Sequence, residues 1–234
     1  MLTVENISAN YGSVRVLWDV SISVKKGEIC GLFGRNAAGK TTLMNCCLRI
    51  MPVSSGRVLI DGKDLAKMRT YEICAQGVGY VSEERDIFPA LTVRDHLCMV
   101  ANASNKKYPE ALKVAKDLFP RLLSLQNRYG CSLSGGEAQA LKLIMALIRD
   151  PKILLLDEPC RGLHPDVFCH FFNEIYRLNQ NEGTTVLLVE QNIAAALKIM
   201  DSYYFMKEGR IILQNAIENP EKDADLISSH ILHA

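Results

Sequence analysis

Residues 34–41 read Gly-Arg-Asn-Ala-Ala-Gly-Lys-Thr and match the pattern G-x-x-x-x-G-K-[ST], which constrains the fold of this chain more than any other feature. An apolar run of strand length, residues 28–33, precedes this stretch, and residues 42–48 have helical character. A glycine-rich turn between a strand and a helix presents backbone N–H groups at a helix N-terminus, where a polyanion binds well. The order of strand, loop and helix therefore predicts a nucleoside triphosphate site.

The residue types in this loop suit phosphate binding. The glycines let the backbone approach the phosphates, Lys40 can reach the β- and γ-phosphates, and the Thr41 hydroxyl can bind Mg²⁺. The residues expected to contact the nucleotide here are Gly34, Arg35, Asn36, Ala37, Ala38, Gly39, Lys40, Thr41 and Thr42. The alternative interpretation is a glycine-rich turn that binds no ligand.

Composition narrows the class of protein. With 234 residues, 48% of them hydrophobic, the chain can bury a sizeable core. Its 27 basic and 26 acidic side chains leave a net charge of +1, so nucleic acid is not an expected partner. The eight cysteines, several of them in apolar runs, are typical of reduced thiols and predict a cytoplasmic location. We see neither a secretory signal pattern nor an apolar run of the about 18 residues that a membrane span needs. If the protein acts at a membrane, another chain must therefore cross it.

The periodicity of apolar residues predicts an α/β fold. Residues 2–8 and 15–24 alternate as antiparallel strands do, and residues 57–60 and 77–82 are expected to complete that β-rich layer. Helical segments are then predicted at residues 92–102, with Thr92 as N-cap, at 109–125 and at 136–148.

The remainder of the chain alternates strands with helices. The strands expected there are residues 153–156, 184–189 and 203–206, and the helices are 165–178, 192–199 and a short helix in the tail, 218–234. We therefore expect a single domain, residues 1–234, with a phosphate-loop core of mainly parallel sheet and an N-terminal antiparallel layer. The core would span about residues 1–90 and 151–234, with an inserted helical lobe at about 91–150.

A second chemical motif follows the strand at 153–156. That strand ends in Asp157 and Glu158, which places both carboxylates at the carboxyl edge of the sheet, where α/β folds bind ligands. Asp157 can hold Mg²⁺, and Glu158 can polarise a water for in-line attack on the γ-phosphate. The alternative is that both residues cap the next helix.

A third motif, Leu-Ser-Gly-Gly-Glu at residues 133–137, stands before a helix with no strand in front of it. The hydroxyl and N–H groups of Ser134, Gly135, Gly136 and Glu137 form a second anion site, although a lone domain needs one only. These three motifs, in this order, resemble the ATP-binding subunit of ABC transporters over essentially the whole chain.

The resemblance implies a role for each motif. Residues 34–42 would be the Walker A loop, 133–137 the ABC signature, and Asp157 and Glu158 the Walker B aspartate and the catalytic glutamate. Tyr11 would stack on adenine, although a plain turn aromatic is its alternative reading. The family also implies ATP and Mg²⁺ as cofactors, and a homodimer or a heterodimer with a similar ATPase. It implies transmembrane permease subunits as partners and a peripheral position on the inner face of the cell membrane.

Two replacements resemble one branch of the family. Glu83 stands where most members have the glutamine of the Q-loop, and Gln191 stands where most have the switch histidine. With Gly162 and Leu163, they resemble the ATPases of branched-chain amino-acid importers of the LivF type, and related urea and amide importers look similar. The resemblance then places Glu83 and Gln191 beside the γ-phosphate, Glu83 also as a possible Mg²⁺ ligand.

Other replacements depart from the family pattern. Arg35 and Ala37 replace the usual proline and glycine of the Walker A loop, Met145 replaces an arginine in the signature helix, and His164 replaces a small residue. We expect these changes to affect nucleotide affinity or turnover more than the fold. Two other functions stay open from the sequence: a soluble ABC-type ATPase not tied to transport, and a degenerate nucleotide-binding module with little turnover.

Overall fold

A six-stranded sheet, a four-stranded sheet and a group of helices make up the computed structural model, which describes residues 1–84, 87–161 and 165–232. The six-stranded sheet has the order β10 (Arg210–Ala216), β9 (Ser202–Lys207), β3 (Ile29–Phe33), β8 (Thr185–Val189), β7 (Ile153–Asp157) and β6 (Val78–Val81). Neighbouring strands are parallel except for β10, which pairs antiparallel with β9. The carboxyl ends of the parallel strands therefore share one edge, and the expected mainly parallel core is confirmed.

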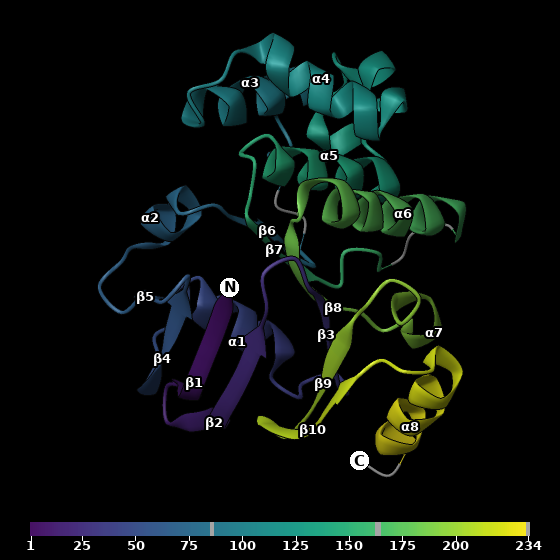
Figure 1. The fold of residues 1–234 in the computed structure, drawn as a ribbon. Coiled ribbons are helices and arrows are strands. Elements are labelled where there is room, and N and C mark those ends of the chain that lie inside the picture. Colours follow the sequence, from purple (N-terminus) through teal and green to yellow (C-terminus); the bar gives the residue numbers. More distant parts are fainter. Residues whose placement is uncertain (85–86, 162–164, 233–234) are drawn as a thin grey trace.

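The four-stranded sheet is antiparallel throughout and comes from the N-terminal part of the chain. Its order is β2 (Val14–Val24), β1 (Leu2–Tyr11), β4 (Ser55–Ile60) and β5 (Lys63–Asp64). The expected N-terminal antiparallel layer is thus confirmed, and Figure 1 shows it to the left of strands β9 and β10 of the six-stranded sheet.

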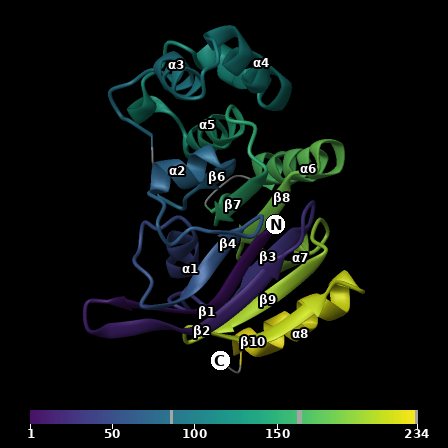
Figure 2. The same cartoon turned by 60° about the vertical axis from the view of Figure 1, so that its left-hand side comes forward.

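The helices divide into those that cover the sheets and those that stand apart. They are α1 (Lys40–Cys47), α2 (Thr70–Ala75), α3 (Val93–Ala103), α4 (Tyr108–Leu118), α5 (Gly135–Leu147), α6 (Pro165–Glu182), α7 (Ile193–Ala196) and α8 (Pro220–Leu232). Figures 1 and 2 show α3 and α4 at the far end from the antiparallel sheet, with α5 and then α6 between them and the core. We call α3 to α5 the helical group. None of the described helices combines the length and hydropathy of a membrane span.

Alternating residues of the buried strands enter two separate cores. Leu154 and Leu156 of β7 face the core that the six-stranded sheet shares with α5 and α6. Ile153 and Leu155 face the core that it shares with α1 and the antiparallel sheet. Because successive side chains of a strand point to opposite faces, the central strands β3, β7 and β8 are covered on both sides and are buried at every residue.

The placement of β6 corrects one expectation. Residues 77–82 do not join the antiparallel layer, because β6 pairs in parallel with β7 at the edge of the core sheet. Gly79 permits this close packing, since a Cβ there would lie 2.8 Å from a methyl carbon of Leu154. A short apolar strand carries no sequence signal for the sheet that it joins.

Several boundaries also differ from expectation. The helix predicted at 109–125 ends at Leu118, because Pro120 cannot continue it and instead opens a 3₁₀ helix, Pro120–Leu125. The helix predicted at 192–199 is the short α7, and sequence reasoning missed β10 and α2. Thr92 caps α3 as predicted, since its hydroxyl accepts from the Asp95 N–H at 3.1 Å.

Candidate nucleotide-binding site

The loop between β3 and α1 has the backbone of a tight phosphate loop. Gly34 and Gly39 have φ angles of 150° and 108°, which favour glycine. A Cβ at Gly34 would also lie 2.3 Å from the Met206 carbonyl oxygen, so the loop passes directly against β9. Ala37 has a φ of 64°, the left-handed region, where a residue with a Cβ carries a cost of about 1 kcal/mol or more. The loop therefore keeps its shape with one strained alanine.

Lys40 opens α1 and is 5% exposed. Its Nζ donates to the carbonyl oxygens of Gly34 at 2.8 Å and Arg35 at 2.9 Å, so it crosses the mouth of the loop. Burial lowers the pKa of this ammonium, while the carboxylates of Glu158 and Asp157 act to raise it. The first turn of α1 carries no acidic side chain, so nothing in it opposes an anion at this N-terminus.

The remaining loop residues divide by exposure. Ala38 and Thr42 are buried, whereas Thr41 is exposed in the first turn of α1. Arg35 and Asn36 are exposed at the tip of the loop. The backbone and Lys40 thus form the base of the site, and side chains that contact solvent form its rim.

Asp157, the last residue of β7, is fully buried. Burial raises the pKa of its carboxyl, and Glu158 adds to this rise, whereas the nearby Thr41 hydroxyl and Lys40 ammonium oppose it. Within the described part of the chain, neither carboxylate oxygen has a hydrogen-bond partner at normal distance. A buried carboxylate without partners is costly, and a hard divalent cation would satisfy it.

These residues therefore fit Mg²⁺, although the protein alone does not complete a metal site. Among residues 1–84, 87–161 and 165–232, no three acidic, histidine or cysteine side chains gather closely enough to hold an ion. Asp157 and Thr41 would hold the cation, with the phosphate oxygens supplying further ligands, as is usual for Mg²⁺ bound with nucleotides.

Glu158 lies where β7 leaves the sheet, and it is 6% exposed. Its φ of 46° is left-handed, and its N–H donates to the Val189 carbonyl oxygen at 2.9 Å, which fixes this turn against β8. The side-chain amide of Gln191 donates to Glu158 Oε2 at 2.7 Å and also lies 3.3 Å from Asn36 Oδ1. Gln191 thus connects Glu158 to the phosphate loop, and its position beside a γ-phosphate stays a prediction.

The backbone around Gln191 is held by a residue that sequence reasoning missed. Glu190 is 6% exposed, and its Oε1 accepts from the N–H groups of Gln191 at 2.9 Å and Asn192 at 3.3 Å. Burial raises the pKa of this carboxyl. Its position after β8, at the same sheet edge as Asp157, was the signal that could have identified it.

Glu83 follows β6 and forms an ion pair with Arg161, a residue that sequence reasoning also missed. The same guanidinium lies 3.7 Å from Glu158 Oε2, so Arg161 stands between the carboxylates of Glu83 and Glu158. The structure therefore brings Glu83 to the Walker B region, but with an arginine as its partner. Only the position of Arg161 three residues after Glu158 could have suggested it.

The signature element is built differently. Ser134 is the N-cap of α5: its hydroxyl accepts from the Glu137 N–H at 3.3 Å, and Glu137 Oε2 accepts from the Ser134 N–H at 2.8 Å. Arg128 lies 4.0 Å from the same carboxylate. Ser134 and Gly135 are exposed, and a Cβ at Gly135 would meet nothing within 4 Å. The element is thus a capped helix N-terminus on the surface, with N–H groups of the first turn that have no partner within the helix.

Tyr11 lies at the exposed end of β1, beside the turn to β2, with 56% of its surface exposed. The hairpin approaches the phosphate loop through Leu17, whose methyl carbon would be 2.9 Å from a Cβ at Gly39. The proposed stacking role of Tyr11 is thus compatible with its exposure. Residues 162–164, which include the replacements Gly162, Leu163 and His164, lie outside the described residues.

Comparison with known proteins identifies the family. Residues 17–161, more than half of the chain, match the family described as ABC transporter. The match covers the phosphate loop, the signature element and the Walker B carboxylates. The chain belongs to the ABC transporter family, as the ATP-binding subunit of a transporter. The ATP-binding domains of this family are ATPases, and this chain is therefore an ATPase.

The relatives include importers and an exporter. The chain is 38% identical to the high-affinity branched-chain amino acid transport ATP-binding protein BraG of Pseudomonas aeruginosa, over 97% of this chain and 99% of that protein. It is 33% identical to a probable branched-chain amino acid transport ATP-binding protein LivF of Archaeoglobus fulgidus, over 90% of each chain. It is also 31% identical to the lipopolysaccharide export system ATP-binding protein LptB of Haemophilus influenzae, over 95% and 93%.

Solved structures agree with the fold. A nucleotide-free ATP-binding cassette from an ABC transporter superposes with a TM-score of 0.85 at 27% identity, covering 100% of this chain and 95% of that one. The ADP conformation of an ATP-binding cassette of an ABC transporter gives a TM-score of 0.85 at 26% identity, covering 100% and 97%. The expected phosphate-loop fold is thereby confirmed.

Proposed function

We propose that this chain hydrolyses ATP to drive an importer for branched-chain amino acids or a related small polar solute such as an amide or urea. The observation that carries the hydrolytic part is the meeting of Lys40, Asp157, Glu158 and Gln191 at one sheet edge. A cation, an unpartnered buried carboxylate and a second carboxylate are the groups that phosphoryl transfer to water requires.

In this proposal each residue has a separate task. The N–H groups of the loop and Lys40 bind the β- and γ-phosphates. Thr41 and Asp157 would hold Mg²⁺, which would neutralise charge on the phosphates. Glu158 accepts a proton from the water that attacks the γ-phosphorus, as the bond to the β-phosphate oxygen breaks and ADP and phosphate form. Gln191 cannot take that proton, since an amide has no basic site near neutral pH, and it instead orients Glu158.

The signature element supports a dimer as the active form. Ser134 and Gly135 present exposed N–H groups at the start of α5, and the capping box satisfies them only in part. We propose that they bind the γ-phosphate of an ATP held by a second subunit, either a copy of this chain or a similar ATPase. In that arrangement two ATP molecules lie between two phosphate loops and two signatures.

A groove supports docking of a permease. A cavity of about 390 Å³ lies between β6, α3 and α5 and is lined by residues that include Val81, Ser82, Met99 and Met145. Ser82 in its lining leads into Glu83 and Glu84, and Phe88 further along the chain is 54% exposed. We propose that a helix of a transmembrane partner enters here, that residues 91–150 transmit its motion as a lobe, and that the chain therefore lies peripherally on the inner face of the membrane.

The solute is the part of the proposal with a clear rival. The relatives named for branched-chain amino acid transport match with higher identity than the one named for lipopolysaccharide export, yet the exporter is close. The test is leucine uptake by cells that produce either the wild-type chain or its Glu158→Gln variant. Lys26→Ala is the matched control, because Lys26 is an exposed lysine in the turn before β3, at the other end of that strand from the phosphate loop.

We expect Glu158→Gln to abolish the uptake and Lys26→Ala to leave it unchanged. Uptake that persists with Glu158→Gln, together with loss of lipopolysaccharide export, would contradict the importer and favour the exporter. Copurification of the chain with its membrane subunits would identify the permease directly.

A further inference from the structure

A buried lysine in the signature helix has no place in the chemistry described so far. Lys142 lies two turns into α5 and is only 7% exposed. A charged side chain is rarely buried to this extent unless its hydrogen-bonding groups are satisfied. What Lys142 contacts therefore indicates what it is for.

The contacts of Lys142 lie far away in the sequence. Its Nζ donates to the carbonyl oxygens of Ser82 at 2.7 Å and of Glu84 at 2.6 Å, the residues on either side of Glu83. The Ser82 hydroxyl also donates to the Glu84 carbonyl oxygen, at 3.2 Å. Residues 82–84 are thus folded around one ammonium that belongs to α5. Because carbonyl groups of the backbone accept these bonds, movement of α5 must displace the segment that carries Glu83.

The segment connects in turn to the hydrolytic residues. The Glu83 carboxylate pairs with Arg161, and the Arg161 guanidinium lies 3.7 Å from Glu158 Oε2. Two carboxylates that share a site repel each other, and a guanidinium between them offsets that repulsion and fixes their separation. The contacts therefore run without interruption from Lys142 through residues 82–84 and Arg161 to Glu158.

We propose that Lys142 and Arg161 are positioning residues of the ATPase reaction that connect the signature helix to Glu158. The inference rests on the proposed role of Glu158 as general base. The signature element is the start of α5, so a ligand that contacts Ser134 shifts the helix that carries Lys142. Lys142 passes the shift to Glu83, and Arg161 passes it to Glu158. Displacement of a catalytic group by about 1 Å can change a rate by about a hundredfold, so a small shift suffices.

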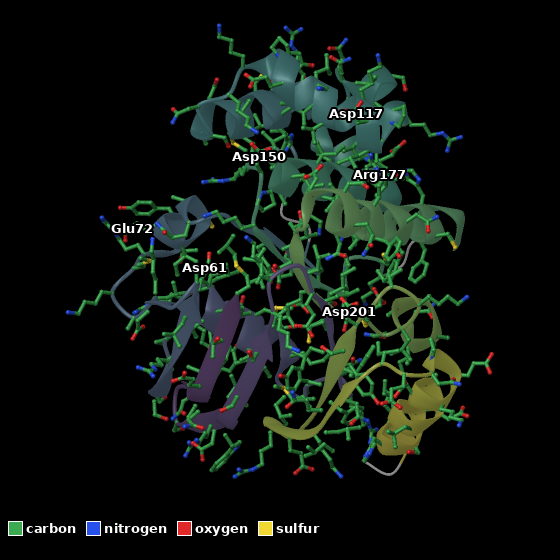
Figure 3. The ribbon with its side chains drawn as sticks, in the orientation of Figure 1. Asp61, Glu72, Asp117, Asp150, Arg177 and Asp201 are labelled. Atoms are coloured by element: carbon green, nitrogen blue, oxygen red, sulfur yellow. The ribbon has the colours of Figure 1, made fainter. Side chains whose placement is uncertain are left out.

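The test compares single and double variants of the full chain in ATP hydrolysis. Lys142→Met keeps the length of the side chain and removes the ammonium, while Arg161→Met removes the guanidinium from a side chain that is 57% exposed. Lys106→Met is the matched control, because it removes a lysine whose ion-pair partner, Asp150, is 75% exposed; Asp150 is labelled beside α5 in Figure 3.

We expect Lys142→Met and Arg161→Met each to lower kcat by about tenfold or more while changing the KM for ATP by less than about twofold. Arg161→Lys, which retains a cation, should recover part of the loss, and Lys106→Met should match wild type. If these contacts act in series, the double variant Lys142→Met/Arg161→Met should lose no more kcat than the more severe single variant. In a Glu158→Gln background, Arg161→Met should cause no further loss of kcat.

The outcomes separate the two proposals. If Glu158→Gln hydrolyses ATP as wild type does, the general base is elsewhere and the proposed function fails. If Glu158→Gln is inactive but Arg161→Met keeps a wild-type kcat, the connection fails alone. The connection would also be overturned if the fold-losses in kcat of Lys142→Met and Arg161→Met multiplied in the double variant, since the effects of independent sites add in free energy. Should Lys142→Met not fold, the Arg161 variants still decide, because that exposed side chain contributes little to stability.

Discussion

The phosphate-loop side of the site and the signature element differ in how their polar groups are satisfied. On the first side Lys40, Asp157 and Glu158 are 5%, 0% and 6% exposed, and Gln191 links Glu158 to a loop residue 155 positions away. On the second side Ser134 and Glu137 satisfy each other within a single helical turn and remain at the surface. The first arrangement therefore depends on the whole fold, whereas the second would survive in an isolated helix.

The contrast has a functional meaning. Among the described residues the Asp157 carboxylate oxygens have no hydrogen-bond partner, which fits a site that a bound cation would complete, so the phosphate-loop side suits a ligand of its own. A capped helix start whose N–H groups contact solvent is prepared for a ligand brought by another molecule. Substitutions on the two sides should accordingly fail in different ways.

Lys40→Ala should have the largest effect, because it removes the only side-chain cation that spans the phosphate loop in the described residues. We expect no ATP binding in a calorimetric titration of the folded variant, with Lys26→Ala binding as wild type does. Undiminished affinity in Lys40→Ala would place the triphosphate elsewhere.

Glu158→Gln should come next, since it keeps the shape of the side chain and removes the proton acceptor. We expect hydrolysis to fall by about a hundredfold or more, within the range of general-base contributions. ATP affinity should hold or improve, because a negative charge near the γ-phosphate is lost. Light scattering with ATP should show a dimer for the variant and mainly a monomer for wild type. Turnover within about threefold of wild type would assign the base to another acid, of which Glu83 is the nearest candidate.

Ser134→Arg should stop hydrolysis while the monomer still binds ATP, because in the proposed dimer the signature acts on the nucleotide of the other subunit. The substitution also removes an N-cap, which costs about 1 kcal/mol. Ser134→Asp is the sharper variant, since aspartate caps a helix as well as serine does but repels a phosphate. Both variants should lose turnover, and only Ser134→Arg should lose stability. Loss of ATP binding by either monomer would contradict action across the dimer.

Asp157→Asn should stabilise the nucleotide-free protein, because it removes a buried charge whose oxygens have no hydrogen-bond partner at normal distance among the described residues. Burial raises the pKa of Asp157, so the folded state holds this proton more tightly than the unfolded state does. The stabilisation of the folded state by the protonated Asp157 carboxyl is present below about pH 4, the ordinary carboxyl pKa. It is lost as the pH rises through the pKa that this carboxyl has in the folded state.

The gain in the free energy of unfolding from Asp157→Asn should therefore be larger at pH 8 than at pH 4. At pH 8 it should be about 1 kcal/mol, which corresponds to a melting temperature about 2–4 °C higher. With Mg²⁺ and ATP present, wild type should become more stable than Asp157→Asn, since only wild type has the carboxylate that the cation needs. An equal gain at both pH values would mean that the charge of Asp157 is not the cause.

Ala37→Gly should have the smallest effect. It relieves a left-handed backbone at one exposed loop residue, so the net gain is below about 1 kcal/mol, because glycine also loses more entropy on folding. Differential scanning calorimetry can detect the accompanying small rise in melting temperature. Ala38→Gly, at the neighbouring buried alanine, is the control and should lower it.

The sequence was informative where the residues of a functional motif are neighbours in the chain. The phosphate loop, the signature and Asp157 with Glu158 each lie within a few residues, and the order of apolar runs predicted a mainly parallel sheet with an antiparallel layer. The roles assigned to those residues stay predictions that the variants above address.

Contacts between distant segments could not be predicted in the same way. The hydrogen bonds of Lys142 to residues 82–84 and the position of Arg161 between two carboxylates depend on how α5, β6 and β7 pack. The sheet that β6 joins and the end of α4 at Leu118 likewise follow from packing and from one proline. Periodicity within a segment carries no information on which neighbour that segment meets.

The left-handed backbone at Glu158 has a consequence for how this chain can change over time. A glycine at that position would remove both the backbone strain and a buried carboxylate, so a variant selected for stability alone would discard the proposed base. A library screened for heat resistance, without ATP turnover as a second criterion, should therefore accumulate Glu158→Gly. A glutamate that persists at such a position across generations would be a sign of selection for turnover.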